Sequence, residues 1–352
     1  MRKAAVGIGV LLVVVGLIVL KTMYDAGNFK RIAPHFAGSC RLVRGPVGSE
    51  DLVISAVDGN AYISACDRRA LRGKARPGAI FRYSLGDEKP VPINLTPTAG
   101  IEFQPHGVSL WTAPDGSQTL FVVNHPAAAS GKPKHTIEIF DIRDGALVHR
   151  RSVTDPELLV MPNDIVGVAA DRFYLTNTHA NPPGEAQQLE TYLRRAQAKV
   201  LYFDGERFRV ALDQMLFPNG INISRDGTRL YIASTTGREL LVYRRDPATE
   251  QLEPDGRLFI GSGLDNIDVD PAGNLWIGAH PQLMATAKLS GDPKALSPSQ
   301  VVRIPPSLDR FDEIYLDDGR QLSGSSVGAA LGNRLLIGQI FDDGFLDCAM
   351  DD

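Results

Sequence analysis

The sequence predicts an all-β protein, a six-bladed β-propeller with an N-terminal transmembrane or signal-anchor helix. Three observations support this prediction: six self-similar segments, a chain of 352 residues that those segments nearly fill, and one apolar stretch at the amino terminus. Propellers of this length often form a single domain. We therefore expect a signal anchor with its juxtamembrane segment at residues 1–27, and a propeller domain at residues 28–352.

The apolar stretch, Ala4–Leu20, contains seventeen consecutive apolar or glycine residues between Arg2-Lys3 and Lys21. Its length lies between that of a signal-peptide core and that of a full membrane span. No clear small-x-small cleavage site follows it. We therefore expect an uncleaved signal anchor in the membrane, with the basic end inside and the propeller on the periplasmic or extracellular side. Cleavage as a signal peptide is the alternative, and it would leave a secreted protein.

The six segments share one pattern: an apolar strand, usually a tight turn of Gly, Asn or Asp, and a second apolar strand. They begin at Asp51, Gly107, Asn163, Asn219, Asp265 and Gly324, so successive starts lie 46 to 59 residues apart. A near-fixed period indicates a repeat architecture, because one such unit cannot bury both of its faces alone. Six units that close on themselves form a propeller of four-stranded blades around a channel.

Polar residues stand at the head of most repeats. In a propeller the innermost strand of each blade lines the channel, so equivalent positions of all repeats meet near one mouth. Here these positions are Glu50, Asp51, His106, Asn163, Asp164, Asn219, Asp265, Asn266 and Ser325. So many carboxylates need a cation, and oxygen donors without thiolates favour calcium. The alternative is that the Asn and Asp residues only form turns.

The chain has three cysteines, Cys40, Cys66 and Cys348. Cys40 precedes the first repeat and Cys348 follows the last, and a propeller must bring its first and last strands together. A Cys40–Cys348 disulfide would lock this closure, and export from the cytoplasm would favour its formation. Three buried free thiols are the alternative. Cys66 ends an apolar strand and is expected in the core.

Two segments between the repeats are expected near the channel mouth. A helix is predicted over Gly184–Lys199, after two prolines, and it would form either a lid or an ordinary surface excursion. Segment Arg68–Gly78 contains five Arg or Lys residues and predicts an exposed basic loop. The net charge of −4, without a basic stripe, excludes nucleic acid as an expected partner.

An ordered set of short motifs spans residues 38–348. They are PHGVS (105–109), VVNHP (122–126), PNDIVGV (162–168), NGINIS (219–224), DNIDVDP (265–271), GNLWIGAHP (273–281) and LLIG (335–338). Together they resemble the paraoxonase family of calcium-dependent lactonases and arylesterases, which is related to the gluconolactonase and senescence-marker propellers. The resemblance implies a six-bladed propeller with two calcium ions in its channel.

The resemblance also implies roles for individual residues. The catalytic calcium would be held by Glu50, Asn163, Asn219, Asp265 and Asn266, and the structural calcium by Asp51, Asp164 and the carbonyl of Val108. His106 and His125 would form the catalytic histidine dyad. The substrate site would be lined by His179, His280 and Phe217. Cys40 and Cys348 match the disulfide of the family.

The expected chemistry is hydrolysis of a small lactone or aryl ester. Calcium would bind the carbonyl oxygen, His106 would act as the base, and His125 would orient it or relay its proton. No Gly-x-Ser-x-Gly elbow occurs, so a serine hydrolase is not indicated.

The sequence departs from the family at Ala279, where many paraoxonases have cysteine, and at Thr178, where they have aspartate. Two alternatives remain open. One is a gluconolactonase-type sugar lactonase with a single divalent metal. The other is a non-catalytic, membrane-tethered partner protein.

Overall fold

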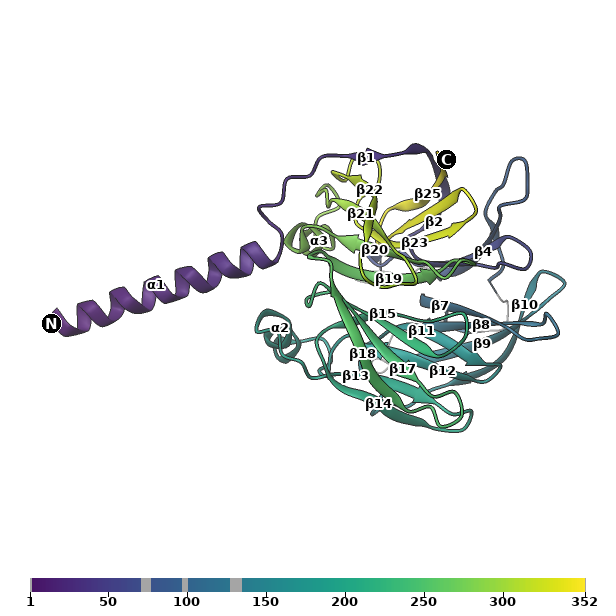
Figure 1. Ribbon diagram of the computed structural model, residues 1–352, viewed down its shortest axis with the longest axis horizontal. Coiled ribbons are helices and arrows are strands. Elements are labelled where there is room, and N and C mark those ends of the chain that lie inside the picture. Colours follow the sequence, from purple (N-terminus) through teal and green to yellow (C-terminus); the bar gives the residue numbers. More distant parts are fainter. Residues whose placement is uncertain (1, 71–76, 97–100, 127–134, 352) are drawn as a thin grey trace.

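The computed structural model describes residues 2–70, 77–96, 101–126 and 135–351. Helix α1 (Arg2–Asp25) projects from a disc of twisted sheets (Figure 1). The sheets are six in the described residues, which confirms the predicted six-bladed all-β propeller. Within the same part of the chain, no helix has the length and apolar character needed to cross a membrane.

Each of the first four blades is one consecutive run of antiparallel strands. The first blade contains β3 (Ser49–Ile54), β4 (Asn60–Ala65), β5 (Ala79–Ser84) and β6 (Ile93–Asn94). The second contains β7 (Pro105–Thr112), β8 (Gln118–Asn124), β9 (Thr136–Arg143) and β10 (Ala146–Val153). The third contains β11 (Pro162–Ala169), β12 (Arg172–Asn177), β13 (Ala198–Phe203) and β14 (Phe208–Met215). The fourth contains β15 (Pro218–Ile223), β16 (Arg229–Ser234), β17 (Glu239–Arg245) and β18 (Leu252–Phe259).

The last two blades also take strands from the amino-terminal end. The fifth contains β19 (Gly263–Val269), β20 (Leu275–His280), β21 (Ser299–Ile304) and β22 (Asp312–Asp317), with β1 (His35–Phe36) at its edge. The sixth contains β23 (Ser325–Leu331), β24 (Arg334–Gln339) and β25 (Asp343–Met350), and β2 (Gly38–Val47) completes it. The ring is thus closed by pairing the start of the propeller with its end.

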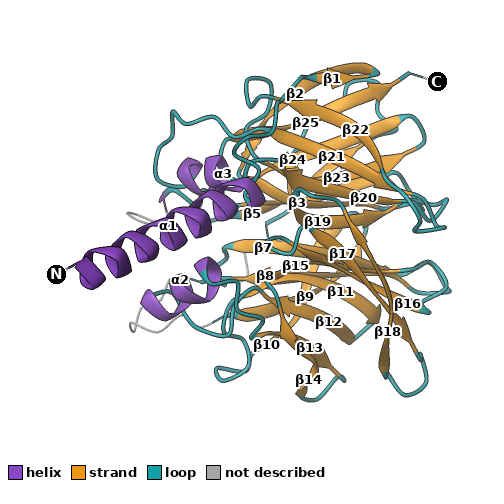
Figure 2. Cartoon of the chain, turned by 60° about the vertical axis from the view of Figure 1, so that its left-hand side comes forward, coloured by secondary structure: helices purple, strands orange, loops and turns teal. Residues whose placement is uncertain are grey.

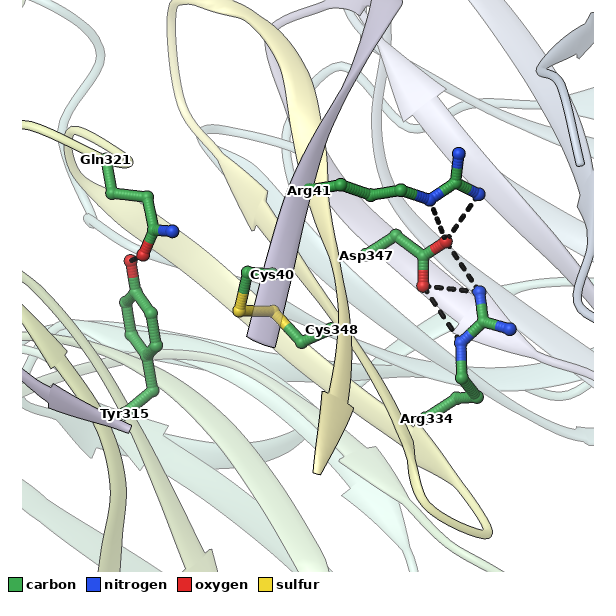
Figure 3. Close-up of a disulfide and its surroundings, with 7 residues drawn as sticks. All are labelled: Cys40, Arg41, Tyr315, Gln321, Arg334, Asp347 and Cys348. Carbon is green, nitrogen blue, oxygen red and sulfur yellow. Dashed lines mark hydrogen bonds and ion pairs between the residues drawn. A yellow bond between two sulfur atoms is a disulfide. The ribbon is translucent and has the colours of Figure 1, made fainter. Parts of the chain in front are cut away.

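The closure is fixed by covalent and ionic contacts (Figure 3). Cys40 lies opposite Cys348 in the β2–β25 ladder, and the two are joined by a disulfide, as predicted. Beside it Asp347 accepts hydrogen bonds from Arg41, at 2.9 Å, and from Arg334, at 2.5 Å. Cys66 is buried and free, so the alternative of three free thiols is wrong.

Apolar side chains fill the spaces between the blades. In the described residues they form six buried clusters, one between each two neighbouring blades. Phe121 of β8 and Phe173 of β12, for example, meet with ring centroids 5.5 Å apart. Full burial of such a side chain contributes roughly 1.5–3 kcal/mol to folding. This packing leaves the polar heads of the inner strands to line the channel.

Three helices gather on one side of the propeller (Figure 2). They are the end of α1, α2 (Glu185–Tyr192) and α3 (Leu283–Leu289). The predicted helix at 184–199 is therefore too long. Helix α2 ends before Arg194, whose positive φ of 49° is incompatible with continuing the helix. Lys199 already lies in β13 of the third blade.

Candidate functional site

The channel mouth is formed where all six inner strands begin. Each of these strands has a register shift at its start, so that one or two residues bulge out of the ladder. The shifts lie at Ser49/Asp51, Pro105/Val108, Pro162/Ile165, Pro218/Ile221, Leu264/Ile267 and Ser325/Val327. A bulge re-aims a side chain that the regular pleat would point elsewhere. Seven predicted site residues occupy these bulges: Glu50, His106, Asn163, Asp164, Asn219, Asp265 and Asn266. Asp51 and Val108 instead pair within the ladder.

The five residues predicted to bind the catalytic cation each present a buried oxygen that has no hydrogen-bond partner among the described residues. The atoms are Glu50 Oε2, Asn163 Oδ1, Asn219 Oδ1, Asp265 Oδ1 and Asn266 Oδ1. An unsatisfied buried polar group costs about 1–3 kcal/mol. A cation among these oxygens would remove that cost, so the residues fit a hard metal ion.

Two of the five residues contact each other directly, and the set also contacts the histidines. The Asn266 amide donates to Glu50 Oε1 at 3.2 Å. His106 Nε2 lies 3.3 Å from Glu50 Oε2, and His280 Nε2 lies 2.8 Å from Asp265 Oδ2. In the described residues, no three His, Cys, Asp or Glu side chains form a metal site on their own. Three of the five unpaired oxygens belong to asparagine amides, and asparagine is not among these four residue types.

Burial raises the pKa of the Glu50 and Asp265 carboxyl groups, and contacts with nearby basic side chains lower it. Burial raises the pKa of Glu50, but His106 and Arg68 outweigh it and lower that pKa to about 2. Burial raises the pKa of Asp265, and its hydrogen bond with His280 offsets only part of this effect. Glu50 is thus held in its anionic form by its contacts with His106 and Arg68.

The predicted structural site, below the mouth, differs from this arrangement. Asp51 accepts hydrogen bonds from the backbone N–H groups of Leu52, at 2.9 Å, and Val108, at 2.7 Å. Asp164 accepts from Ile165 and Ile221, both at 2.7 Å. All four carboxylate oxygens therefore have donors, and each Asp connects its blade to a neighbouring blade. Val108 meets Asp51 through its N–H.

Burial raises the pKa of both aspartates well above its ordinary value, and the charge of Asp164 raises that of Asp51 further. Two buried carboxylates in electrostatic contact need a proton or a cation. The pair fits a cation by its charge, whereas the five-residue set fits one by its unpaired oxygens.

The predicted histidine dyad is part of a row of three imidazoles. His106 Nδ1 lies 2.9 Å from His125 Nε2, and His125 Nδ1 lies 2.7 Å from His135 Nδ1. Burial, with the charges of His106 and His135, lowers the pKa of His125 well below its ordinary value. The sequence reasoning missed His135. The pairing of Asn124 with Thr136 in the β8–β9 hairpin is the signal that places it beside His125.

Arg68 was also missed as a site residue, because five basic residues in a row of eleven predicted an exposed loop. Its side chain is only 12% exposed and lies 3.6 Å from Glu50. It also donates to the carbonyl oxygens of Gly48, at 2.9 Å, and Pro105, at 3.4 Å. These carbonyls and Glu50 draw the guanidinium inward, so the prediction is wrong for Arg68. Residues 71–76 of the same segment lie outside the described residues.

The predicted lining residues border one cavity of about 730 Å³, together with Glu50, His106, Asn163, Asn219 and Asp265. The rings of His179 and Phe217 meet edge to face, with centroids 4.7 Å apart. His179 Nε2 lies 2.8 Å from Thr191 Oγ1 of α2, which also borders the cavity. His280 lines the cavity and contacts Asp265. Helix α2 therefore stands over the mouth rather than away from it.

A family model described as arylesterase matches residues 35–350. The chain belongs to the arylesterase family. It is 34% identical to the serum paraoxonase/arylesterase 1 of Homo sapiens over 325 residues, 89% of each chain. It is 33% identical to the serum paraoxonase/arylesterase 2 of Rattus norvegicus over 316 residues, 86% of each chain. Arylesterases are carboxylic ester hydrolases, and this arylesterase-family chain is therefore an enzyme of lactonase/arylesterase type; the non-catalytic alternative is not supported.

Solved structures support the fold of this arylesterase. A gluconolactonase from Xanthomonas campestris matches with a TM-score of 0.55 and 16% identity, over 92% of this chain and 99% of that one. A calcium-binding regucalcin from Agrobacterium tumefaciens matches with a TM-score of 0.53 and 16% identity, over 90% and 95%. At these identities the likeness concerns the propeller fold alone.

Proposed function

We propose that this enzyme is a calcium-dependent hydrolase of lactones and aryl esters, with its active site at the polar floor of the 730 Å³ cavity. The observation that supports it most is the set of five buried, unpaired oxygens. Glu50, Asn163, Asn219, Asp265 and Asn266 would hold the catalytic calcium. Asp51, Asp164 and Val108 would hold a second, structural ion.

The histidines provide the acid–base chemistry. Calcium, when bound, supplies a Lewis acid that stabilises negative charge on an ester oxygen. His106 Nε2 faces the floor, 3.4 Å from the Asn163 amide, and is the atom that accepts a proton from the attacking water. His125, neutral because its pKa is lowered, holds the His106 ring through the Nδ1 contact. The cavity wall of His179 and Phe217 excludes water from the rest of the substrate.

The test is a panel of γ-lactones, δ-lactones, acyl-homoserine lactones and phenyl acetate, each with and without a chelator. We expect hydrolysis that stops on exhaustive chelation and returns when calcium is added. Full activity in the chelated enzyme would refute calcium dependence. Absence of hydrolysis across the panel with calcium present would refute the proposed substrate class.

One observation favours the alternative of a sugar lactonase with a single divalent metal. The carboxylate oxygens of Asp51 and Asp164 all accept hydrogen bonds. Of the two proposed metal sites, the five-residue set is therefore the one whose oxygens lack hydrogen-bond partners among the described residues. Counting bound calcium by elemental analysis after dialysis separates the two proposals. Two ions per chain support the paraoxonase-type site, and one ion, with turnover of gluconolactone, supports the alternative.

We also propose that Ala4–Leu20 anchors the enzyme to a membrane, with the propeller on the outer side. The disulfide supports an oxidising compartment, and the relatives are named serum proteins. Sequencing the amino terminus of the enzyme from its host tests this proposal. An intact terminus in the membrane fraction supports an anchor, and a chain that starts after about residue 26 in the soluble fraction indicates a cleaved signal and a secreted enzyme.

A further inference from the structure

The last turn of α1 is attached to the rim of the substrate cavity by ion pairs. Asp25 Oδ2 lies 3.2 Å from Arg194, and Asp25 Oδ1 lies 3.3 Å from Arg238. Lys21, one turn earlier, contacts Asp25 at 2.5 Å. Arg194 follows α2, and Arg238 stands between β16 and β17, so one carboxylate connects three separate elements.

The residues after Asp25 continue this attachment through the backbone. The carbonyl of Ala26 accepts the N–H of Leu283 at 2.9 Å, at the start of α3. Gly27 approaches Pro281 so closely that a Cβ would lie 1.9 Å from its carbonyl oxygen. Lys30 donates to the carbonyl of Gly261 at 2.6 Å. The juxtamembrane segment is therefore packed against the propeller, and is not a free linker.

The cavity has two different parts. Its floor carries the polar groups of the proposed active site. Its rim carries Lys21, Thr22, Asp25 and Arg194 beside a group of apolar side chains. These come from α1, from the residue that follows it, from α3 and from the segment before β25: Ile18, Ala26, Leu283, Met284, Ile340 and Phe341. A compact lactone or aryl acetate needs the floor only. A substituent on such a substrate would extend over the rim and contact the end of α1.

We propose that Ile18 and Ala26, together with Leu283 and Met284 of α3, form a subsite for an apolar substrate tail, and that Asp25 is the positioning residue that holds the α1 side of this wall in place. The proposal rests on the proposed hydrolase function. Without the Asp25 carboxylate, the guanidinium groups of Arg194 and Arg238 would lose their shared counter-ion. Helix α1 and the end of α2 would then separate, and the tail would lose one wall while the floor stays unchanged.

The test compares two lactones with the same ring, one bare and one with a long alkyl tail, in the full-length chain. Asp25→Asn removes the ion pairs with Lys21, Arg194 and Arg238. This loss should raise KM for the tailed lactone by about two- to ten-fold, with kcat unchanged. The bare lactone should show no change in KM. Asp255→Asn is the matched control, because it removes a surface pair with Arg229 at 3.1 Å, away from the cavity.

Charge reversal provides a rescue. Asp25→Arg should weaken use of the tailed lactone further, and Asp25→Arg combined with Arg194→Asp should restore it in part. Equal effects on both lactones, or no effect on either, would overturn the subsite. Equilibrium dialysis of the tailed lactone under chelation measures binding without turnover. Wild-type binding that Asp25→Asn leaves unchanged overturns the subsite, and weaker binding supports it, whatever the outcome for catalysis.

Discussion

The channel mouth and the seam of the ring, where β2 pairs with β25, both bring together side chains that are far apart in the sequence. The two regions differ in how their buried polar atoms find hydrogen-bond partners. At the seam, Asp347 accepts hydrogen bonds from Arg41, Arg334 and Tyr83, beside the Cys40–Cys348 disulfide. At the mouth, five buried oxygens have no hydrogen-bond partner in the part of the chain that the structure describes. At the seam the protein itself satisfies the buried carboxylate, whereas at the mouth we propose that a bound cation does so.

The largest expected effect is on the mouth. Asp265→Ala should lower activity below detection and weaken calcium binding, because it removes one of two anionic oxygens from the five. Chelated variant and chelated wild type should unfold at similar temperatures, since burial already disfavours this carboxylate. Titration calorimetry with calcium and thermal unfolding measure both effects. A variant that binds calcium normally would contradict the assignment, and Asp255→Ala serves as a remote control.

The second prediction concerns the imidazole row at the same mouth. His106→Gln should lower kcat for lactones by about 10²–10⁴, the usual cost of losing a general base. Calcium binding and the melting temperature should remain those of the wild type, because His106 is not one of the five residues whose oxygens are proposed to bind calcium. Activity within a few-fold of wild type would make His106 a structural residue. His149→Gln, on β10 and paired with Glu138 at 2.9 Å, is the histidine control.

The third prediction concerns Asp51 in the proposed structural site, whose oxygens accept hydrogen bonds from two backbone N–H groups. Asp51→Ala leaves the N–H groups of Leu52 and Val108 without acceptors, so it should lower the free energy of unfolding by about 2–6 kcal/mol even without calcium. Asp51→Asn keeps an acceptor and should cost less. Urea unfolding of chelated samples measures both. If Asp51→Ala matters only when calcium is present, then Asp51 is a ligand rather than a connection between blades.

Much of this arrangement could be predicted from the sequence. Apolar stretches separated by tight turns of Gly, Asn or Asp identified the strands, and the repeat period identified six blades. The head of each repeat identified Glu50, Asn163, Asn219 and Asp265. Ring closure identified the partner of Cys40. Each of these predictions depends on a local pattern or on the topology of a closed ring.

Contacts that depend on side-chain direction could not be predicted. Ser325 was expected at the mouth, but its hydroxyl lies 3.0 Å from the carbonyl of Gln300, within the neighbouring blade. Arg68 belongs to a basic segment that predicts exposure, and only the geometry of nearby carbonyls draws it inward. The docking of Asp25 depends on two arginines more than 150 residues away in the chain. None of these contacts leaves a periodic signal.

The smallest expected effect lies at the seam and depends on pH. Burial raises the pKa of Asp347, but hydrogen bonds from Arg334 and Tyr83 outweigh it, so the pKa in the folded protein is below the ordinary 3.8. A lowered pKa gives stability that is fully present above 3.8 and is lost as the pH falls through the folded value. Asp347→Asn should therefore melt at a lower temperature than wild type at pH 6, with the difference shrinking below pH 4. Its kcat should match wild type at pH 7, because the seam is complete without substrate or metal. A melting difference that is the same at pH 6 and pH 3 would show that the carboxylate charge does not stabilise the seam.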